Sequence, residues 1–474
     1  MIPSRGSFWS PVILAGLAGW QCGAPGKPFD AEAAGIVAVV DVAVLPMDSE
    51  AVLRGQTVIV RNSLIAEVGP ADAVDVPAGA QRIDGVGLYL MPGLTDAHVH
   101  LRDHGELLSY LAYGVTTVVH LGGPTGNIPD VVRLREQVAS GAVPGPNIYT
   151  AGRMLDGDPP VFPGVSTVVR TPAEATRAVE GQLEDSVDLI KVYNNLRTEQ
   201  LQAVTRAAHE RDVMVWGHVP RIDGRATALQ QALAAGLDVM VHGEEVFFTM
   251  LYRDVEAQLD QGLVPTPDVA LMRAAVRAIR ESDVAVIPNL SFVAMTRVQL
   301  DDVEQVWADP ETRFLNPTVL NMWRQQNPTR RADLERFNRR ERGKQAIVRQ
   351  LTGALQEAGV PMLLGTDASA PGMFPGKSAH LELAELVGAG LTPYQALAAG
   401  TSNPGRLVGQ RVRRSPAFGT VTIGSRADLV LLTANPLTDI AHVSRLVGVM
   451  VRGEWYARGR IDSLRAPDAA EPRR

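Results

Sequence analysis

The chain has 474 residues, which is longer than one ordinary domain of roughly 100–200 residues, and 46% of its residues are hydrophobic. Its formal net charge is −7, and no block of Lys and Arg interleaved with aromatic residues occurs, so the sequence argues against a nucleic-acid partner. Cys22 is the only cysteine, which excludes an intrachain disulfide framework and a cysteine-rich zinc site. Any metal site must therefore be built from histidines and carboxylates.

The N-terminal 26 residues have the order typical of a secretory signal. Arg5 is the only charged side chain before Lys27, an apolar stretch follows at 8–20, and a small-residue region, "QCGAPG", comes next. The apolar stretch is shorter than the ~20 residues that span a bilayer. We therefore expect an exported protein, periplasmic or secreted, with a signal segment at 1–26. Cys22 is a candidate lipid anchor, although Gln21 stands where a small residue is preferred; an unstructured start is the alternative.

Both ends of the remaining chain are rich in short β-runs. Residues 33–91 contain "VIVRNSLIAEVG", which predicts two strands around an Arg-Asn-Ser turn, and residues 411–463 contain "ADLVLLT" and "VGVMVRGEWYARGR". These patterns predict one small β-sandwich domain formed by both ends of the chain. Residues 464–474 are expected to be a disordered tail.

The middle of the chain, residues 92–410, alternates apolar runs with amphipathic helical segments. The runs are continuously apolar, as buried parallel strands require, and eight such units predict an α/β fold with a (β/α)8 TIM-type barrel. A long charged region at about 251–345 is expected to be a helical insertion, its charges forming a solvated helix face. The predicted strands are 94–98, 116–121, 147–151, 188–192, 213–218, 239–242, 284–288 and 361–365.

Titratable side chains gather at the ends of these strands, where barrels of this type carry their chemistry. His98 and His100 are two residues apart, so they face the same side of an extended segment, and neutral imidazole is a common metal ligand. Each histidine taken alone has an ordinary alternative as a hydrogen-bonded core residue. Their joint occurrence at strand ends favours a metal site. The collected residues are His98, His100, Lys191, His218, His242 and Asp367.

Lys191 lies within the apolar run "LIKVY", where an unpaired ammonium is costly to bury. It either extends to the barrel rim or pairs with a carboxylate such as Asp188, or it is carbamylated by CO2 to N6-carboxylysine and bridges two metals. Asp367 also has two possible interpretations. It is a turn or helix-cap residue, or it binds a metal and takes a proton from the attacking water.

The motifs "PGLTDAHVH", "GVTTVVHLGG", "IKVY", "GHV", "VHGEE" and "LLGTDAS", in this order, resemble the amidohydrolase superfamily. The similarity spans about 36–460 and is greatest to the imidazolonepropionase-like members with a bridging lysine, which include metal-dependent Xaa-Pro dipeptidases. The set is specific for the superfamily and less so for the subgroup.

The resemblance implies two divalent ions, usually zinc. His98, His100 and Asp367 would hold the buried ion, His218 and His242 the exposed one, and carboxylated Lys191 would bridge them together with a hydroxide. Asp367 would carry the proton to the leaving nitrogen. Tyr193 is a candidate donor to the oxyanion, or an ordinary aromatic at the rim. Further candidate substrate contacts are His120, Glu244 and Asn289.

These residues favour a binuclear hydrolase that cleaves an amide bond in a dipeptide such as Xaa-Pro or in an N-acyl amino acid. The partner would be a small molecule or short peptide, and a homo-oligomer is expected. The first alternative is a mononuclear deaminase or a cyclic-amide or lactone hydrolase on the same fold, against which Lys191 weighs. The second is a non-catalytic binding barrel, against which the six intact candidate ligands weigh.

Overall fold

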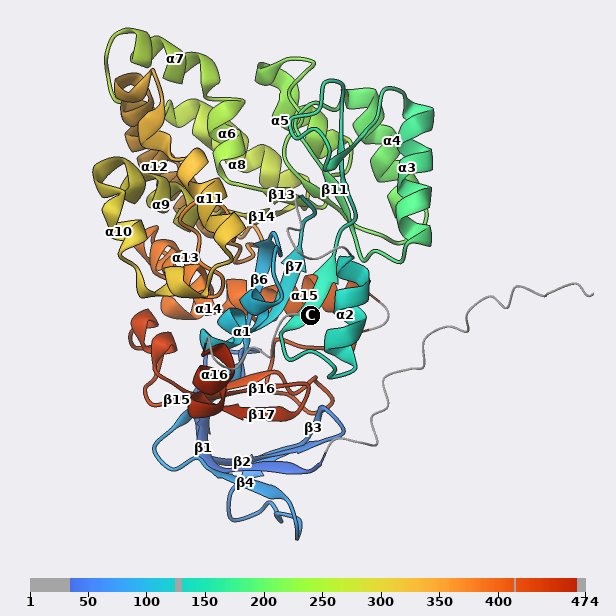
Figure 1. Cartoon of the computed structure of the whole chain (residues 1–474), viewed down its shortest axis with the longest axis vertical. Coiled ribbons are helices and arrows are strands. Elements are labelled where there is room, and N and C mark those ends of the chain that lie inside the picture. Colours follow the sequence, from blue (N-terminus) through green and yellow to red (C-terminus); the bar gives the residue numbers. More distant parts are fainter. Residues whose placement is uncertain (1–34, 124–129, 413–414, 467–474) are drawn as a thin grey trace, which may run out of the picture.

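The computed structural model describes residues 35–123, 130–412 and 415–466 (Figure 1). The predictions for 1–26, for a lipid at Cys22 and for 467–474 fall outside these residues. The chain has an α/β fold in which parallel strands and helices alternate, with a separate sheet at one end of the molecule. No helix in the described ranges is both long and apolar enough to cross a membrane.

The middle of the chain contains two parallel sheets, with strand orders β6-β7-β8 and β10-β9-β11-β12-β13-β14. Seven of these strands overlap the predicted segments, while β9 and β10 were not predicted. The bounds are β6 (Leu94–Val99), β7 (Val115–His120), β8 (Asn147–Thr150), β9 (Met154–Asp156), β10 (Ser166–Val168), β11 (Ile190–Val192), β12 (Val215–Gly217), β13 (Val239–Val241) and β14 (Ala285–Ile287).

Backbone contacts link the edges of the two sheets. Ala151 and Leu189 form a parallel bridge between the segments of β8 and β11. The predicted eighth strand, 361–365, lies between β14 and β6: Leu363 N–H donates to Val286 O (2.9 Å), and Ala97 N–H donates to Leu364 O (2.8 Å). Parallel strands joined in this order are consistent with a TIM-type barrel.

Helices follow most of the strands and bury one apolar face. In α8, Met272, Ala275 and Ile279 are buried at helical spacing, and Asp268 caps the N-terminus by accepting from Ala270 N–H. The helices of this part are α1 (Gly105–Ala112), α2 (Val131–Ala139), α3 (Pro172–Glu184), α4 (Thr198–His209), α5 (Arg225–Ala234), α6 (Glu244–Phe248), α7 (Tyr252–Asp260), α8 (Val269–Glu281), α9 (Leu290–Asp302), α10 (Glu304–Trp307), η2 (Pro310–Phe314), α11 (Pro317–Gln325), η3 (Pro328–Arg330), α12 (Leu334–Glu357), α13 (Lys377–Gly388), α14 (Pro393–Gly400) and α15 (Ser402–Arg411).

The small domain is one sheet that combines strands from both ends of the chain, in the order β17-β16-β15-β5-β1-β2-β3 with β4 paired to β1. Asn62 and Ser63 have φ angles of 50° and 67°, as the tight turn between β2 and β3 requires. A packing of two layers, as in a sandwich, stays a prediction. The elements are β1 (Val37–Val44), β2 (Leu53–Arg61), β3 (Leu64–Pro70), β4 (Gln81–Asp84), β5 (Tyr89–Pro92), β15 (Leu429–Leu432), η4 (Ile440–Ser444), β16 (Leu446–Val451), β17 (Glu454–Ala457) and α16 (Arg458–Arg465).

The C-terminal boundary differs from the prediction. Helix α16 continues to Arg465 and buries Ile461, so the first residues of the predicted tail are helical. An apolar side chain within this short helix packs into the core, which the β-rich pattern before it did not reveal.

Candidate metal centre

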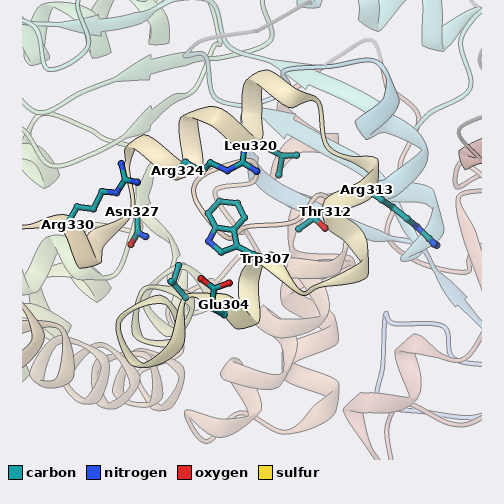
Figure 2. A pocket seen from close by; sticks show the side chains of 9 residues that line it. Glu304, Trp307, Thr312, Arg313, Leu320, Arg324, Asn327 and Arg330 are labelled. Atoms are coloured by element: carbon teal, nitrogen blue, oxygen red, sulfur yellow. The ribbon is translucent and has the colours of Figure 1, made fainter.

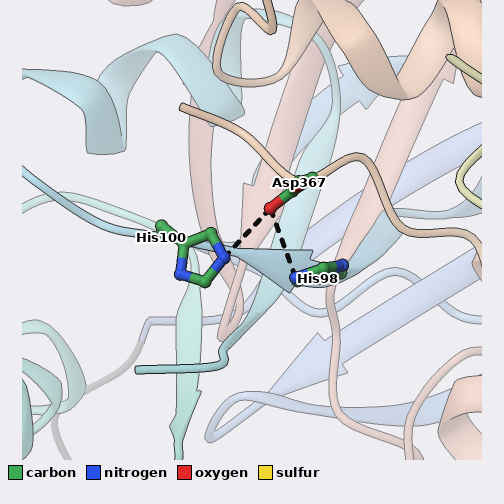
Figure 3. Close-up of side chains that lie close together, drawn as sticks. All are labelled: His98, His100 and Asp367. Carbon is green, nitrogen blue, oxygen red and sulfur yellow. Dashed lines mark ion pairs between the residues drawn. The ribbon is translucent and has the colours of Figure 1, made fainter. Parts of the chain in front are cut away.

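His98, His100 and Asp367 come together at the end of β6 (Figure 3). One Asp367 oxygen, Oδ1, lies 3.3 Å from His98 Nε2 and 3.0 Å from His100 Nε2. One ligand atom from each of the three residues lies within 4.8 Å of the others, which is close enough for all three to hold one ion. The His-x-His spacing therefore presents both imidazoles to one carboxylate.

Hydrogen bonds on the far side of each ring set the orientation of these two histidines. His100 Nδ1 lies 2.6 Å from Gly122 O, and His98 Nδ1 lies 3.2 Å from Asn289 Oδ1. Since both partners are acceptors, Nδ1 carries the hydrogen in each ring and Nε2 keeps a lone pair directed at the cluster.

Asn289 is a predicted substrate contact, which stays a prediction, and the structure shows the protein partners of its amide group. Its side chain is fully buried, with Oδ1 facing His98 and Nδ2 donating to Gly365 O (3.0 Å). The bond to Gly365 fixes which end of the amide faces His98. Asn289 thus positions a candidate ligand.

Three non-glycine residues of this region have left-handed backbone conformations: His242 (φ 71°), Asn289 (φ 53°) and Asp367 (φ 65°). Such conformations cost free energy and cluster at functional sites. Burial acts to raise the pKa of Asp367, but its contact with the His100 ring and the charge of nearby basic groups hold the pKa below its usual value. Asp367 is therefore an ionised carboxylate at neutral pH.

His218 and His242 follow β12 and β13 and extend the cluster. Their ring centroids are 4.7 Å apart, the His242 ring lies 4.9 Å from that of His98, and His242 Nε2 lies 3.9 Å from Asp367 Oδ2. Burial lowers the pKa of His242 to about 3 and that of His218 well below its usual value. Both rings are therefore neutral, which is the form that binds metals.

Glu245 supports His218 and was not predicted. Its Oε1 lies 2.8 Å from His218 Nδ1, and its Oε2 accepts from Arg221 (2.9 Å). A carboxylate behind the imidazole orients the ring and leaves Nε2 available. The two adjacent glutamates in "VHGEE" indicated that a carboxylate lies near this strand end, but the pattern did not show which of them faces His218.

Lys191 lies in β11 with 1% of its surface exposed, and its Nζ has no hydrogen-bond partner within the described residues. Its proposed alternative partner, Asp188, instead accepts from Arg135 (2.7 Å). Burial lowers the pKa of Lys191 to about 7, so a large fraction of the amine is neutral at physiological pH.

The unsatisfied atoms test whether a metal fits. Among the buried side-chain atoms without a hydrogen-bond partner are His98 Nε2, His242 Nδ1 and Lys191 Nζ. Imidazole nitrogens and a carboxylate are the ligands that Zn²⁺ prefers, and orphaned buried polar atoms are rare in folded proteins. The donor set fits divalent metal binding.

Asp96, two residues before His98, was missed by the sequence argument. It is fully buried, accepts from Thr366 Oγ1 (2.6 Å) and Thr366 N–H (3.0 Å), and burial raises its pKa to about 7. Because Thr366 precedes Asp367, this contact holds the two halves of the cluster in register.

The other predicted substrate contacts have protein partners. His120 is 1% exposed, and its Nδ1 accepts from Leu101 N–H (3.1 Å). Glu244 forms an ion pair with Lys344 (2.7 Å). Substrate contacts by these two residues stay predictions. Tyr193 lies at the cluster, its ring 4.2 Å from that of His218, and burial raises its pKa.

The model of the amidohydrolase family matches residues 89–456, which is most of the chain. The chain therefore belongs to the amidohydrolase family and is a hydrolase that acts on carbon–nitrogen bonds.

Solved structures share the fold at low sequence identity. A provisional prolidase from Bifidobacterium longum is 24% identical with a TM-score of 0.67, covering 91% of this chain and 98% of that one. A Xaa-Pro dipeptidase with bound methionine is 19% identical with a TM-score of 0.65, covering 89% and 100%. The bottromycin amidohydrolase is 23% identical with a TM-score of 0.68, covering 92% and 90%.

Curated relatives match over short stretches only. A dihydroorotase from Streptococcus pyogenes is 42% identical over 80 residues, which is 15% of this chain and 19% of that protein. A dihydroorotase from Trichlorobacter lovleyi is 52% identical over 48 residues, covering 10% and 11%. The chain thus matches less than a fifth of the length of these relatives.

Proposed function

We propose that the protein is a binuclear, zinc-dependent hydrolase that cleaves the amide bond of a dipeptide such as Xaa-Pro or of an N-acyl amino acid. The observation that carries this proposal is Lys191, a buried amine beside the histidine and aspartate cluster that has no hydrogen-bond partner among the residues that the structure describes. Fold similarity to a Xaa-Pro dipeptidase supports the substrate class.

Lys191 is proposed to react with CO2. Its neutral amine forms an N–C bond with the carbon of CO2 and loses a proton, which gives N6-carboxylysine. The product is a negatively charged carbamate, and its two oxygens are able to bind two ions. His98, His100 and Asp367 would then hold one ion, His218 and His242 the other, and carboxylated Lys191 would bridge them.

Divalent ions bound there would lower the pKa of a water and polarise the scissile carbonyl. Asp367, ionised and directed at the cluster, accepts the proton of the attacking water and passes it to the leaving nitrogen. Tyr193 keeps its hydroxyl proton because burial raises its pKa, so it is able to donate to the oxyanion from its place beside His218.

A second candidate is a hydrolase of a cyclic amide or lactone, and the local similarity to proteins named dihydroorotase favours it. The same carboxylate and hydroxyl would act on a ring amide. Dihydroorotate, a cyclic amide, is the test substrate that distinguishes this function from hydrolysis of an acyclic amide.

We further propose that the linked strands form a closed (β/α)8 barrel with a helical insertion at about 251–345, and that the small domain is a sandwich. Export after removal of residues 1–26 is also proposed. The mass of the protein recovered from cells tests this last point, because cleavage after residue 26 and lipidation at Cys22 give different masses.

The function is tested on zinc-loaded protein by metal analysis together with assays of Xaa-Pro dipeptides, N-acyl amino acids and dihydroorotate. We expect about two ions per chain and hydrolysis of an acyclic amide. No bound metal after zinc supplementation would contradict the proposal, and turnover of dihydroorotate alone would favour the second candidate.

The lysine has its own assay. Metal-free protein reloaded with zinc in ¹³C-bicarbonate should give a carbamate carbon signal in NMR, and the Lys191→Met protein should lack it. Zinc uptake without a carbamate signal would separate a metal centre from a carboxylated lysine.

A further inference from the structure

A cavity of about 560 Å³ lies in the helical segment between α9 and η3, and it shares no lining residue with the metal centre (Figure 2). Small-molecule sites commonly have volumes of roughly 300–1,000 Å³. Helices α10 and α11, with η2 and η3, form its walls. The cavity is thus large enough for a small organic ligand.

One wall is aromatic and apolar. Figure 2 shows the Trp307 ring at the centre of the group, with Arg324 on one side and Glu304 on the other. Leu320 adds aliphatic surface, and the Arg324 guanidinium lies 5.3 Å from the Trp307 ring centroid. A guanidinium placed against an aromatic face is held in a narrow range of positions. The Arg324 guanidinium is therefore positioned to bind an anion next to the Trp307 ring.

The charge of the lining is positive. Arg324 and Arg330 contribute two guanidinium groups, against the single carboxylate of Glu304, while the guanidinium of the third lining arginine, Arg313, lies over the Phe314 ring, 4.6 Å from its centroid. Within the described residues none of the three arginines forms an ion pair with a carboxylate. Elsewhere in the same helical region arginines are paired, as Arg336 is with Glu256 (2.7 Å). The cavity thus leaves positive charge available next to an aromatic wall.

We propose that this cavity binds an organic anion with an aromatic or other apolar part, the anion meeting Arg324 and Arg330 and the apolar part packing on Trp307 and Leu320. The proposal goes beyond the hydrolytic function and does not depend on it. Such an anion is either a separate ligand from solution or the acidic far end of a substrate.

The wall of the cavity reaches the metal centre through one further side chain. The Trp307 ring lies 6.4 Å from that of Trp323, and Trp323 Nε1 donates to Ser369 O (3.0 Å). Ser369 follows Asp367 by two residues. A ligand on Trp307 would therefore be separated by one side chain, Trp323, from the loop that carries Asp367.

The test is calorimetric titration of the full protein with 3-phenylpropionate, 3-phenylpropanol and acetate. The alcohol keeps the ring and lacks the charge, and acetate keeps the charge and lacks the ring. We expect 3-phenylpropionate to bind at one site per chain and each of the other two to bind at least about tenfold more weakly. The alcohol lacks the hydrogen bond to a charged group, and acetate lacks the buried ring; each accounts for roughly a factor of ten or more.

Variants locate the site. Arg324→Gln and Trp307→Leu should each weaken binding of 3-phenylpropionate roughly tenfold, while Arg273→Gln, on the exposed face of α8, should not. Binding should persist in His100→Asn, since a carboxylate seated on a metal would be lost there. Arg324 is exposed, so thermal unfolding should show that Arg324→Gln folds normally.

Affinity that is unchanged in both Arg324→Gln and Trp307→Leu, or no binding at millimolar concentration, would overturn the proposal. Competition with substrate that disappears in Arg324→Gln identifies the far end of the substrate as the occupant. Simultaneous binding of substrate and 3-phenylpropionate identifies a separate ligand. Both of these results support the binding site, and they show whether its occupant is part of the substrate or a separate ligand.

Discussion

Lys191 and Lys344 are both buried, with 1% and 4% of their surfaces exposed, but their neighbours differ. Lys344 Nζ lies 2.7 Å from both Glu244 and Glu341, and these carboxylates raise its pKa despite the opposing effect of burial. Lys191 has no such partner in the part of the chain that the structure describes, and burial lowers its pKa to about 7. Burial alone therefore does not make a lysine reactive; burial without a carboxylate in direct contact leaves a large fraction of the amine neutral at physiological pH.

Lys191→Met should have the largest effect on activity. It removes the proposed bridge between the ions, and metal catalysis supplies several kcal/mol, so kcat/KM should fall on the order of 10³-fold or more. Zinc content should fall with it, whereas the free energy of unfolding should change little because a costly buried amine is replaced by an apolar side chain. A Lys191→Met protein that retains activity and zinc would show that the lysine is structural.

Lys344→Met should have the opposite pattern. It leaves Glu244 buried without its cation and leaves Glu341 with Arg340 alone, which costs about 3–5 kcal/mol of unfolding free energy. Urea denaturation measures the loss. Lys377→Met is the matched control, because Lys377 pairs with Asp309 at a more exposed position and should cost no more than about 1 kcal/mol. Equal stability losses in Lys191→Met and Lys344→Met would refute the contrast between the two lysines.

Asn289→Ala tests the histidine side of the same centre. Without the bond to Asn289, His98 loses its fixed orientation, and zinc affinity should fall roughly 10–100-fold. Competition with a chelator measures this change. Asn435→Ala, in the small domain, serves as the control, and equal zinc affinities in the two variants would remove the positioning role of Asn289.

The smallest expected effect is on the pH dependence of the unfolding free energy, and it comes from the buried carboxyl group of Glu382. Glu382 accepts from Leu290 N–H (3.1 Å) and Ser291 N–H (2.6 Å), and burial raises its pKa from 4.5 to about 7. The native state then holds a proton that the unfolded chain releases, so the free energy of unfolding falls as pH rises between these values. Glu382→Gln should lack this part of the slope, and parallel stability curves for the two proteins would contradict the raised pKa.

The sequence predicted those parts of the site that depend on local pattern. Continuous apolar runs located the strands, and the residues at their ends, His98, His218 and His242, do converge. The supporting contacts were missed because they join distant segments: His98 to Asn289 across 191 residues, and Asp96 to Thr366 across 270. No local periodicity encodes such pairs.

Short strands limited the fold prediction in a similar way. Strand β11 is three residues long, and the segment at 361–365 bonds to both neighbours without forming a named strand. A run of apolar residues shows that a segment is buried, but the number of ladder bonds it makes depends on the twist and spacing of its neighbours. Strands β9 and β10 were missed because they are short and lie within a Gly- and Pro-rich stretch.

The pairing of β5 with β15 has a consequence for how the protein is made. Tyr89 is opposite Leu432 in this antiparallel ladder, so the two strands are about 340 residues apart along the chain. At roughly 5–20 residues per second, a ribosome needs on the order of 20–70 s to synthesise the intervening segment. During that time the edge of β5 has no native neighbour on one side, and unpaired strand edges recruit other chains. Slow translation should therefore lower the yield of soluble protein, and a chaperone that covers this edge should raise it.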